Sequence, residues 1–365
     1  MGGRTLTLEK IKSYLELRIP VYEFLNDHQD IDFTPVVSET AAQESVLTHL
    51  KESKIIERNA YYARLFLKSY ISLIEKLGFE LSEELYEIYC EPVILNAQEL
   101  CPTDTDVIKY PIGGFDEKQP TEISKLGSLP FDSVLIKETP KVISGINTTG
   151  LRTWEAALYL SNYLNNKKSP PYDFKGKTLL ELGGGTGLLS LSLLSYYHHH
   201  ISPIERLVLT DGAVSVFDHF NATLKLNGIS NSESQSPGIR CQQLLWGTTN
   251  SSNPESFIQD PVPNVDVVLA ADVTYDSTIL EPLCSTIHDF FTYSGTKVAI
   301  IAATVRNEDT IRDWENELEK WFRAPSLAWK VKDRCLKPED IDSLVWFRRG
   351  TPEIRIYEIT SSIKT

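Results

Sequence analysis

TLLELGGGTGLLSLSLL, residues 178–194, decides the fold of this chain. A short, mostly apolar segment runs into a cluster of glycines, and a longer apolar segment follows. This order predicts a buried strand, a tight turn and the start of a helix. Several folds present their backbone to a nucleotide in this way, so the question is which nucleotide the turn holds.

Apolar segments recur at steady intervals after residue 178, with helical segments between them. They read TLLEL (178–182), RLVLTD (206–211), VDVVLAAD (265–272) and KVAIIAAT (297–304). Continuous apolar strands that alternate with helices predict an α/β fold with a doubly wound, mostly parallel sheet. IRIYEIT, residues 354–360, follows no full crossover helix, which predicts an antiparallel pair at that end of the sheet.

The first 125 residues have a different pattern. ERNAYYARLFLKSYISLIEKLG, residues 57–78, carries apolar side chains at three- and four-residue spacing and ends on a glycine, which predicts a helix. Residues 110–130 are rich in Gly, Pro and Ser and read as a connector. We therefore expect a mainly helical N-terminal domain over residues 1–125 and an α/β domain over residues 126–365.

Charge narrows the classes of partner. The 365 residues carry a formal net charge of −14, which disfavours a stand-alone nucleic-acid binder. Residues 1–130 hold 22 acidic and 13 basic side chains and so most of the excess. This region would either attract a basic protein or simply form a well-solvated helical surface.

Targeting and redox features are few. No apolar run approaches the roughly 20 residues that cross a bilayer, and the N-terminus has no signal-like apolar core. The five cysteines are scattered, as expected of reduced thiols. We predict a cytoplasmic protein with no membrane contact, and we take a monomer as the default.

The glycine loop fits neither of two common nucleotide motifs. The dinucleotide fingerprint, counted from Gly183, needs a glycine where Leu188 stands. A P-loop would end in Gly-Lys-Ser or Gly-Lys-Thr, which this stretch lacks. What remains is an acidic residue before the turn, Glu181, followed by Gly-x-Gly-x-Gly over residues 183–187, and a second acid, Asp211, at the end of the next strand.

This combination is typical of the nucleoside site of S-adenosylmethionine-dependent methyltransferases. Small residues let a ligand approach the backbone closely, and an acid at the end of the second strand can accept hydrogen bonds from both ribose hydroxyls. The ligand has no pyrophosphate, so the third glycine of the dinucleotide motif is not needed. Another class of nucleotide enzyme is the alternative.

Three further residues follow later strands. Trp246 ends CQQLLW, residues 241–246, which we take as a further strand, the third in chain order; its ring offers a plane on which adenine can stack, although a core tryptophan would give the same pattern. Asp272 and Tyr275 lie at the end of the next strand, VDVVLAAD, the fourth in chain order. Because ligands bind at the carboxyl ends of parallel strands, we expect both to face the methyl-transfer centre. Asp272 could instead cap the next element.

Two stretches are possible decoys. SPPY, residues 169–172, resembles the loop with which amino-methyltransferases hold a planar nitrogen, but it follows a polar helix end and reads better as a linker. His198, His199 and His200 are consecutive, so they lack the spacing of a helical metal site. We interpret them as a solvated loop and predict no metal.

By these residues the segment from about 145 onward resembles the seven-strand protein-lysine methyltransferases of the methyltransferase-16 group. The matching features are Trp154 in the helix before the glycine loop, the acid-x-Gly-x-Gly loop over residues 181–187, Trp246 with Gly247, and the Asp-x-x-Tyr motif over residues 272–275. TTGLRTWEAALYL (148–160) and AATVRNEDTIRDWENELEKW (302–321) resemble the elongation factor 2 lysine methyltransferases, whose members carry a helical N-terminal extension.

The resemblance implies a seven-stranded Rossmann-like sheet and a set of site residues. Cofactor-binding positions would be Trp154, Glu181, Gly183, Gly184, Gly185, Gly187, Asp211, Trp246 and Ala271. Asp272 and Tyr275 would carry the catalytic motif, Asp272 by orienting the incoming amine or the methionine end of the cofactor, and Tyr275 by lining the lysine channel.

The function implied is transfer of methyl groups from S-adenosylmethionine to a lysine of translation elongation factor 2. The alternative is a methyltransferase that acts on another protein, on RNA or on a small molecule. A methyltransferase of RNA or of a small molecule would share the cofactor loop, but it would be expected to show a basic face or a properly placed Pro-Pro loop. The N-terminal domain would either dock the substrate or only pack against the catalytic domain.

Overall fold

The computed structural model describes residues 4–26, 31–115, 133–141, 149–166, 168–200, 203–229, 238–247, 264–323 and 325–361. Of residues 26 and 198–200 it describes the backbone alone. Most of the predicted connector, with the predicted domain boundary between residues 125 and 126, lies outside these ranges. Within them, no helix is long and apolar enough to cross a membrane.

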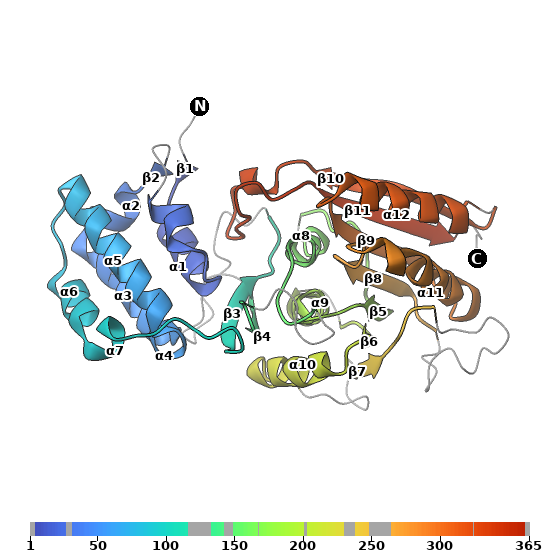
Figure 1. Ribbon diagram of the computed structural model, residues 1–365, viewed down its shortest axis with the longest axis horizontal. Helices are drawn as coiled ribbons and strands as arrows, with labels where there is room; N and C mark the ends of the chain where they lie inside the picture. Colours follow the sequence, from blue (N-terminus) through green and yellow to red (C-terminus); the bar gives the residue numbers. More distant parts are fainter. Residues whose placement is uncertain are drawn as a thin grey trace.

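A seven-stranded sheet lies at the centre of the C-terminal part (Figure 1). Its strands are β5 (Thr178–Leu182), β6 (Arg206–Asp211), β7 (Gly238–Gln243), β8 (Val267–Ala271), β9 (Val298–Thr304), β10 (Leu327–Cys335) and β11 (Ile354–Ser361). The order across the sheet is β10-β11-β9-β8-β5-β6-β7. Strand β11 runs antiparallel to both β9 and β10, and the remaining pairs are parallel. The predicted α/β sheet with an antiparallel last strand is confirmed.

Helices cover both faces of this sheet, as Figure 1 shows. They are α8 (Glu155–Leu164), α9 (Leu188–His200), α10 (Ser215–Leu226), α11 (Leu280–Tyr293) and α12 (Glu308–Trp321). Successive residues of β5 alternate between the two faces: Leu179 packs with the core under α8 to α10, and Leu180 with the core under α11 and α12. Burial on both sides explains why the strands read as continuous apolar runs.

The predicted loop at residues 198–200 is wrong, because the backbone of α9 stays helical as far as His200. Tyr196 and Tyr197, just before the histidines, are almost fully buried. Their packing extends the helix beyond the apolar stretch that the sequence pattern marked.

The N-terminal part is mainly helical and lies beside the sheet (Figure 1). Its elements are β1 (Arg4–Thr5), α1 (Leu8–Glu16), the π-helical turn η1 (Tyr22–Asn26), β2 (Ile31–Asp32), α2 (Thr34–Val37), α3 (Thr40–Glu52), α4 (Ile55–Arg58), α5 (Ala60–Leu77), α6 (Glu83–Cys90) and α7 (Pro92–Leu95). Helix α5 begins where the Asn59 side chain accepts a hydrogen bond from the Tyr62 amide. It ends at Gly78, whose φ is 75°.

An antiparallel hairpin of β3 (Asp106–Pro111) and β4 (Ser133–Glu138) lies between the two parts. Its strands fall on either side of the predicted boundary, with β3 against α1 and β4 against α9 and α10. The segment between β10 and β11, which contains the 3-10 turn η4 (Pro338–Asp340), also reaches the helical part. There the Ser13 hydroxyl donates to the Leu344 carbonyl at 2.8 Å. The apolar residues of the helical part and of the α8 to α10 face form one continuous core.

Gly187 shows how tightly the glycine loop packs against its neighbours. Its φ is +78°, and a Cβ at this position would overlap the Phe220 ring of α10. Gly78 has nearly the same φ, +75°, but nothing lies within 4 Å of the Cβ position. The two glycines therefore share the backbone requirement, and only Gly187 adds a steric one.

Replacing Gly187 by Ala is therefore expected to lower the free energy of unfolding by about 2–4 kcal/mol, from the left-handed backbone and the forced overlap together. Gly78→Ala, the matched control, carries only the backbone cost of about 1 kcal/mol. Urea denaturation of both variants measures the difference. Equal losses in the two variants would contradict the packing role of Gly187.

Candidate cofactor and methyl-transfer site

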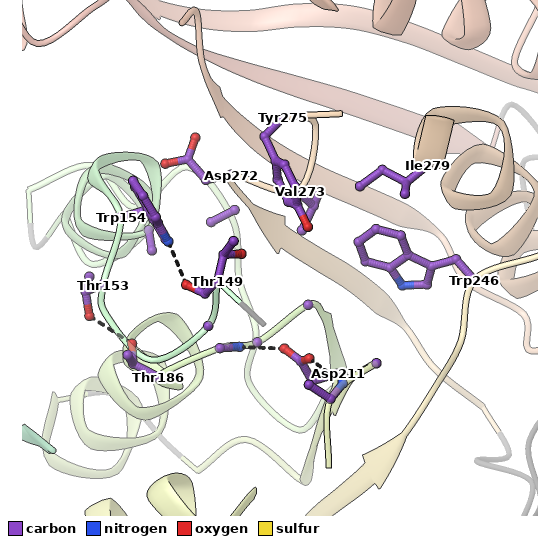
Figure 2. A pocket seen from close by; sticks show the side chains of 18 of the residues that line it. Thr149, Thr153, Trp154, Thr186, Asp211, Trp246, Asp272, Val273, Tyr275 and Ile279 are labelled. Atoms are coloured by element: carbon purple, nitrogen blue, oxygen red, sulfur yellow. Dashed lines mark hydrogen bonds between the residues drawn. The ribbon is translucent and has the colours of Figure 1, made fainter. Parts of the chain in front are cut away.

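A cleft with a volume of about 490 Å³ opens at the carboxyl ends of β5, β6 and β8 (Figure 2). Its walls come from the glycine loop after β5, the ends of β6 and β8, the segment before α8, and the start of α11. The size lies within the range of about 300–1,000 Å³ that is usual for small-molecule sites. Parallel strands of a doubly wound sheet place such a crevice at this edge.

The glycine loop forms the floor of the cleft. Gly183 and Gly185 have φ values of 62° and 52°, and the Gly184 amide donates to the Thr210 carbonyl at 2.9 Å. A Cβ on Gly183 would lie 2.8 Å from Val273 Cγ1 and 3.3 Å from Cζ2 of Trp246. Any side chain there would fill the space in which a ligand would rest on the backbone.

Asp211 ends β6 beside this loop, as Figure 2 shows. Its Oδ2 accepts from the Gly185 amide at 3.1 Å, and its Oδ1 accepts from the Ala213 amide at 2.9 Å. Burial raises the pKa of Asp211, and these backbone bonds oppose the rise. The carboxylate lines the cleft with acceptor capacity left on each oxygen, which suits a pair of ribose hydroxyls.

Trp246 lies on the opposite wall, next to Ile279 and Val273 (Figure 2). The ring is half-buried and packs against the α11 core, so it has both of the predicted features: it is a core residue on one side and a cleft wall on the other. Ile279 belongs to the 3-10 turn η3 (Ser277–Ile279) before α11. Together these side chains make an apolar slot at the adenine end of the expected ligand.

Asp272 lies at the end of β8 and joins three elements. Its Oδ1 accepts from the Thr304 amide at 2.9 Å. Its Oδ2 accepts from the Thr304 hydroxyl at 3.0 Å, from the Ala156 amide at 3.1 Å and from Nη2 of Arg306 at 3.2 Å. Burial raises the pKa of Asp272, and Arg306 opposes the rise most strongly. The carboxylate therefore caps α8, a distant element, whereas the sequence suggested a cap on the next one.

Trp154 precedes α8 and forms the wall facing Asp272. Its Nε1 donates to the Thr149 carbonyl at 3.0 Å. The guanidinium groups of Arg152 and Arg306 lie over the ring, 4.6 Å and 4.9 Å from its centroid. Arg306 also pairs with Glu155 at 2.6 Å. The tryptophan is thus held rigidly at the mouth of the cleft.

Sequence reasoning missed Arg306 and, apart from Trp154, the segment before α8. Arg306 lies two residues after the predicted strand KVAIIAAT, and a charged residue so close to the end of a buried strand was the available signal. In the segment before α8, the Thr153 and Thr186 hydroxyls lie 2.8 Å apart, which ties that segment to the glycine loop (Figure 2). No pattern in the sequence reveals this contact.

Two predicted cofactor positions lie outside the cleft lining. Gly187 faces Phe220, as described above. Glu181 points to the other side of the loop, where its Oε2 accepts from the Ser190 amide at 3.1 Å and from the Ser190 hydroxyl. Burial raises the pKa of Glu181 to about 7. The structure corrects their predicted role to support of the loop from behind, because both face the protein interior.

The other predicted residues lie together. Gly183, Gly184, Gly185, Asp211, Trp154, Trp246, Ala271, Asp272 and Tyr275 all line the cleft. Tyr275 is 57% exposed and stands at the opening. The SPPY stretch lies elsewhere, since Tyr172 stacks on Phe174 and donates to Glu358. Over the part of the chain that the structure describes, no group of three or more His, Cys, Asp and Glu residues has the arrangement of a metal site.

The donor set fits S-adenosylmethionine. A backbone floor that tolerates no Cβ, a carboxylate at the end of the second strand and an apolar slot would take its nucleoside, and the rigid wall of Trp154 would face its methionine end.

Comparison with known proteins gives the same assignment. The family model described as "Lysine methyltransferase" matches residues 142–321. Protein-lysine N-methyltransferase EFM3 of Saccharomyces cerevisiae is 31% identical over 333 residues, covering 85% of this chain and 88% of its own. EFM3 of Chaetomium thermophilum is 34% identical over 50% of this chain and 51% of its own. Protein-lysine N-methyltransferase EEF2KMT of Homo sapiens is 27% identical, with 75% and 73% covered.

The buried Glu181 generates a pH prediction. Its pKa of about 7 in the folded chain lies above the roughly 4.3 of an unfolded glutamate. The folded state therefore loses up to about 4 kcal/mol of stability as pH rises from about 4.3 through 7. Glu181→Gln keeps an acceptor for Ser190 and removes this loss, so its stability advantage over the parent should grow between pH 5 and pH 8.

Urea denaturation across this pH range measures the effect, and the affinity for S-adenosylhomocysteine is the control. Because Glu181 does not line the cleft, Glu181→Gln should leave that affinity unchanged. A pH-independent stability difference would contradict the raised pKa. A large loss of affinity would restore the predicted direct contact with the cofactor.

Proposed function

The chain belongs to the lysine methyltransferase family, and we propose that this S-adenosylmethionine-dependent protein-lysine N-methyltransferase modifies a lysine of translation elongation factor 2. The observation that carries the protein-lysine activity is the 31% identity to EFM3 over 85% of the chain. Such coverage extends into the helical N-terminal part, because residues 126–365 make up only about two thirds of the chain. The name of the human relative, EEF2KMT, supports elongation factor 2 as the substrate.

The cleft residues divide the cofactor between them. Asp211 would accept hydrogen bonds from the ribose hydroxyls, the backbone of Gly183 to Gly185 would hold the nucleoside, and Trp246 would stack on adenine. Trp154 and Ala271 would hold the methionine end. When bound, S-adenosylmethionine supplies an electrophilic methyl group on a sulfonium, which is a good leaving group. The protein therefore acts mainly by positioning the amine and excluding water.

The amine must lose its proton before it can accept a methyl group. A free lysine has a pKa of about 10.4, and both removal from water and a nearby cation lower it. The apolar walls around Trp154 and Val273 exclude water from the amine, so deprotonation to solvent precedes attack.

Asp272 and Tyr275 have different parts in this scheme. The four protein donors on Asp272 favour a positioning role, in which it holds the start of α8 and Arg306 in place, over a role as a general base. Tyr275 lines the entry of the lysine side chain, since it is exposed at the opening of the cleft. Its ring face can stabilise the ammonium as it enters.

Methyl transfer from isotopically labelled S-adenosylmethionine tests the substrate. The enzyme is offered purified elongation factor 2 and, in parallel, whole extract, both from cells that lack this enzyme. Elongation factor 2 should acquire label on a single lysine, mapped by mass spectrometry. Asp211→Ala, which removes the acceptor for the ribose, should abolish the label at limiting cofactor. Label on another protein of the extract, with none on elongation factor 2, would overturn the substrate and leave the lysine chemistry standing.

Substitution of Tyr275 separates the ring face from the hydroxyl. Tyr275→Ala should lower kcat/KM for the protein substrate by about 10-fold, as expected for loss of a contact between a cation and an aromatic ring. Tyr275→Phe should stay within about 3-fold of the parent, because the ring is kept. Melting temperature and S-adenosylhomocysteine affinity serve as controls. If Tyr275→Phe is as slow as Tyr275→Ala, the hydroxyl and not the ring acts on the lysine. If Tyr275→Ala is as fast as the parent, Tyr275 has no role in binding the lysine.

A further inference from the structure

A second, smaller pocket lies beside the cofactor cleft, where the helical part meets the α/β part. It has a volume of about 160 Å³. One wall is the turn after α1, residues 17–20, together with Ile108 and Tyr110 of β3. The other is formed by residues 152–155 and 346–348. Arg152, Thr153 and Trp154 line both this pocket and the cleft, so the two spaces are separated by a single layer of residues.

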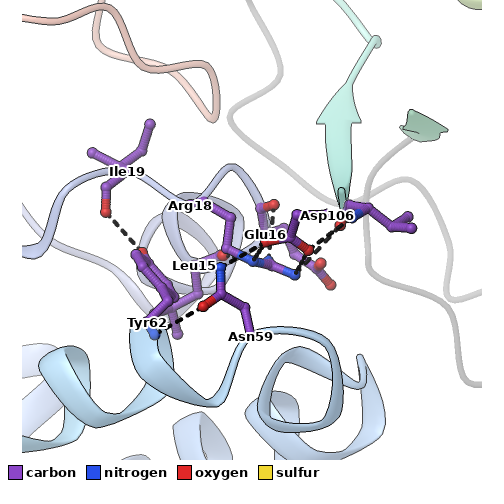
Figure 3. Close-up of polar contacts among 8 residues, drawn as sticks. Leu15, Glu16, Arg18, Ile19, Asn59, Tyr62 and Asp106 are labelled. Atoms are coloured by element: carbon purple, nitrogen blue, oxygen red, sulfur yellow. Dashed lines mark hydrogen bonds and ion pairs between the residues drawn. The ribbon is translucent and has the colours of Figure 1, made fainter. Parts of the chain in front are cut away.

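The wall from the helical part is rigid. Arg18 has a φ of 53°, and its guanidinium donates to Asp106 from Nε at 3.1 Å and from Nη2 at 3.3 Å. Asn59 also donates to this carboxylate, at 2.9 Å (Figure 3). Arg18 and Asp106 are both buried, which makes such a pair costly to open. The pocket therefore has a fixed shape, set by contacts between α1, β3 and α5.

The acidic groups of the pocket already have partners. Glu155 is paired with Arg306 at 2.6 Å. Glu138 is buried and accepts from the Tyr110 hydroxyl at 2.7 Å and from the Thr153 hydroxyl at 2.6 Å. A cationic ligand group would find no carboxylate there without displacing one of these donors.

The basic groups differ from one another. Arg18 is neutralised by Asp106, and Arg348 lies 3.5 Å from Glu23. Arg152 has its guanidinium over Trp154, and within the described ranges no carboxylate lies within 4 Å of it. Stacking fixes the plane of a guanidinium and leaves its N–H donors pointing outward from the edge, the geometry that receives a carboxylate through two hydrogen bonds.

We propose that this pocket binds an acidic side chain of the protein substrate, an aspartate or glutamate near the target lysine, and that Arg152 receives its carboxylate. The inference rests on the protein-lysine activity, and its assay rests on elongation factor 2 as the substrate. An acid held one residue layer from the cleft places the neighbouring lysine at the cleft opening beside Tyr275.

The carboxylate of the cofactor's methionine end is the competing ligand for Arg152, because Arg152 lines both spaces. The electrostatics show that the charge of Arg152 reaches the second pocket as well as the cleft. Burial raises the pKa of Glu138, and Arg152 is among the groups that oppose the rise. Burial also acts on Glu155, whose pKa is nevertheless held low by Arg306 and, more weakly, by Arg152. Both carboxylates line the second pocket, so the charge of Arg152 is felt there.

Steady-state kinetics of Arg152→Gln on elongation factor 2 test the assignment. KM for the protein should rise about 10-fold or more, as expected for loss of a charged hydrogen bond, and by clearly more than the Kd for S-adenosylhomocysteine, because Arg152 also stacks on Trp154 in the cofactor cleft. Arg312→Gln, at an exposed arginine of α12, is the control and should change neither value. A parallel loss of S-adenosylhomocysteine affinity would assign Arg152 to the cofactor, and an unchanged KM would remove the pocket from substrate binding.

A charge exchange gives the sharper readout. Each acidic residue near the mapped lysine of elongation factor 2 is replaced in turn by Lys, and each variant is offered to the parent enzyme and to Arg152→Glu. One substrate variant should be poor for the parent and at least partly rescued by Arg152→Glu. Failure of every pair to rescue would overturn the proposal. If the parent enzyme labels no elongation factor 2, the proposed substrate fails first, and both tests move to the protein that the extract assay labels.

Discussion

The geometry of the site depends on the carboxylate of Asp272. This one group accepts hydrogen bonds from the start of α8, from the end of β9 and from Arg306, so it ties the end of β8, which lines the cleft, to these three neighbours. The backbone of Asp272 is left-handed, with a φ of 55°, a conformation that aspartate tolerates better than most residues. Strain of this kind persists only where surrounding contacts determine it, and here the same contacts build the wall beside Trp154.

The helical part is joined to the α/β part through buried apolar surface and through polar contacts of the segment between β10 and β11. Because the two parts share one packed core, we do not expect them to rotate against each other as separate domains. The second pocket is formed at this junction, with one wall from each part. The helical part can therefore contribute to substrate selection without moving, and its acidic surface is free to act over longer distances on a basic partner.

Sequence patterns predicted best the parts of the site that are built from residues close together in the chain. Three local patterns predicted the cleft: the spacing of the glycines, an acidic residue at the end of each of two strands, and a tryptophan after a third. Gly183, Asp211 and Trp246 do line one cleft. Pairs far apart in the chain carry no such signal: Ala156 and Asp272 meet across 116 positions. For Glu181 the motif gave the position but not the direction of the side chain, because strand alternation turns it toward Ser190 and the interior.

The carboxylates around the cleft must be compatible with a lysine amine that reacts beside a cationic sulfonium. Methyl transfer brings a cationic sulfonium beside an amine that must become neutral, so an unpaired carboxylate close by would hold the amine as ammonium and slow the reaction. Asp272 and Glu155 both pair with Arg306, whose single positive charge offsets part of their combined negative charge while the pairs keep the polar framework intact. Such local pairing helps a protein with a formal net charge of −14 to carry out a reaction that needs a neutral lysine amine.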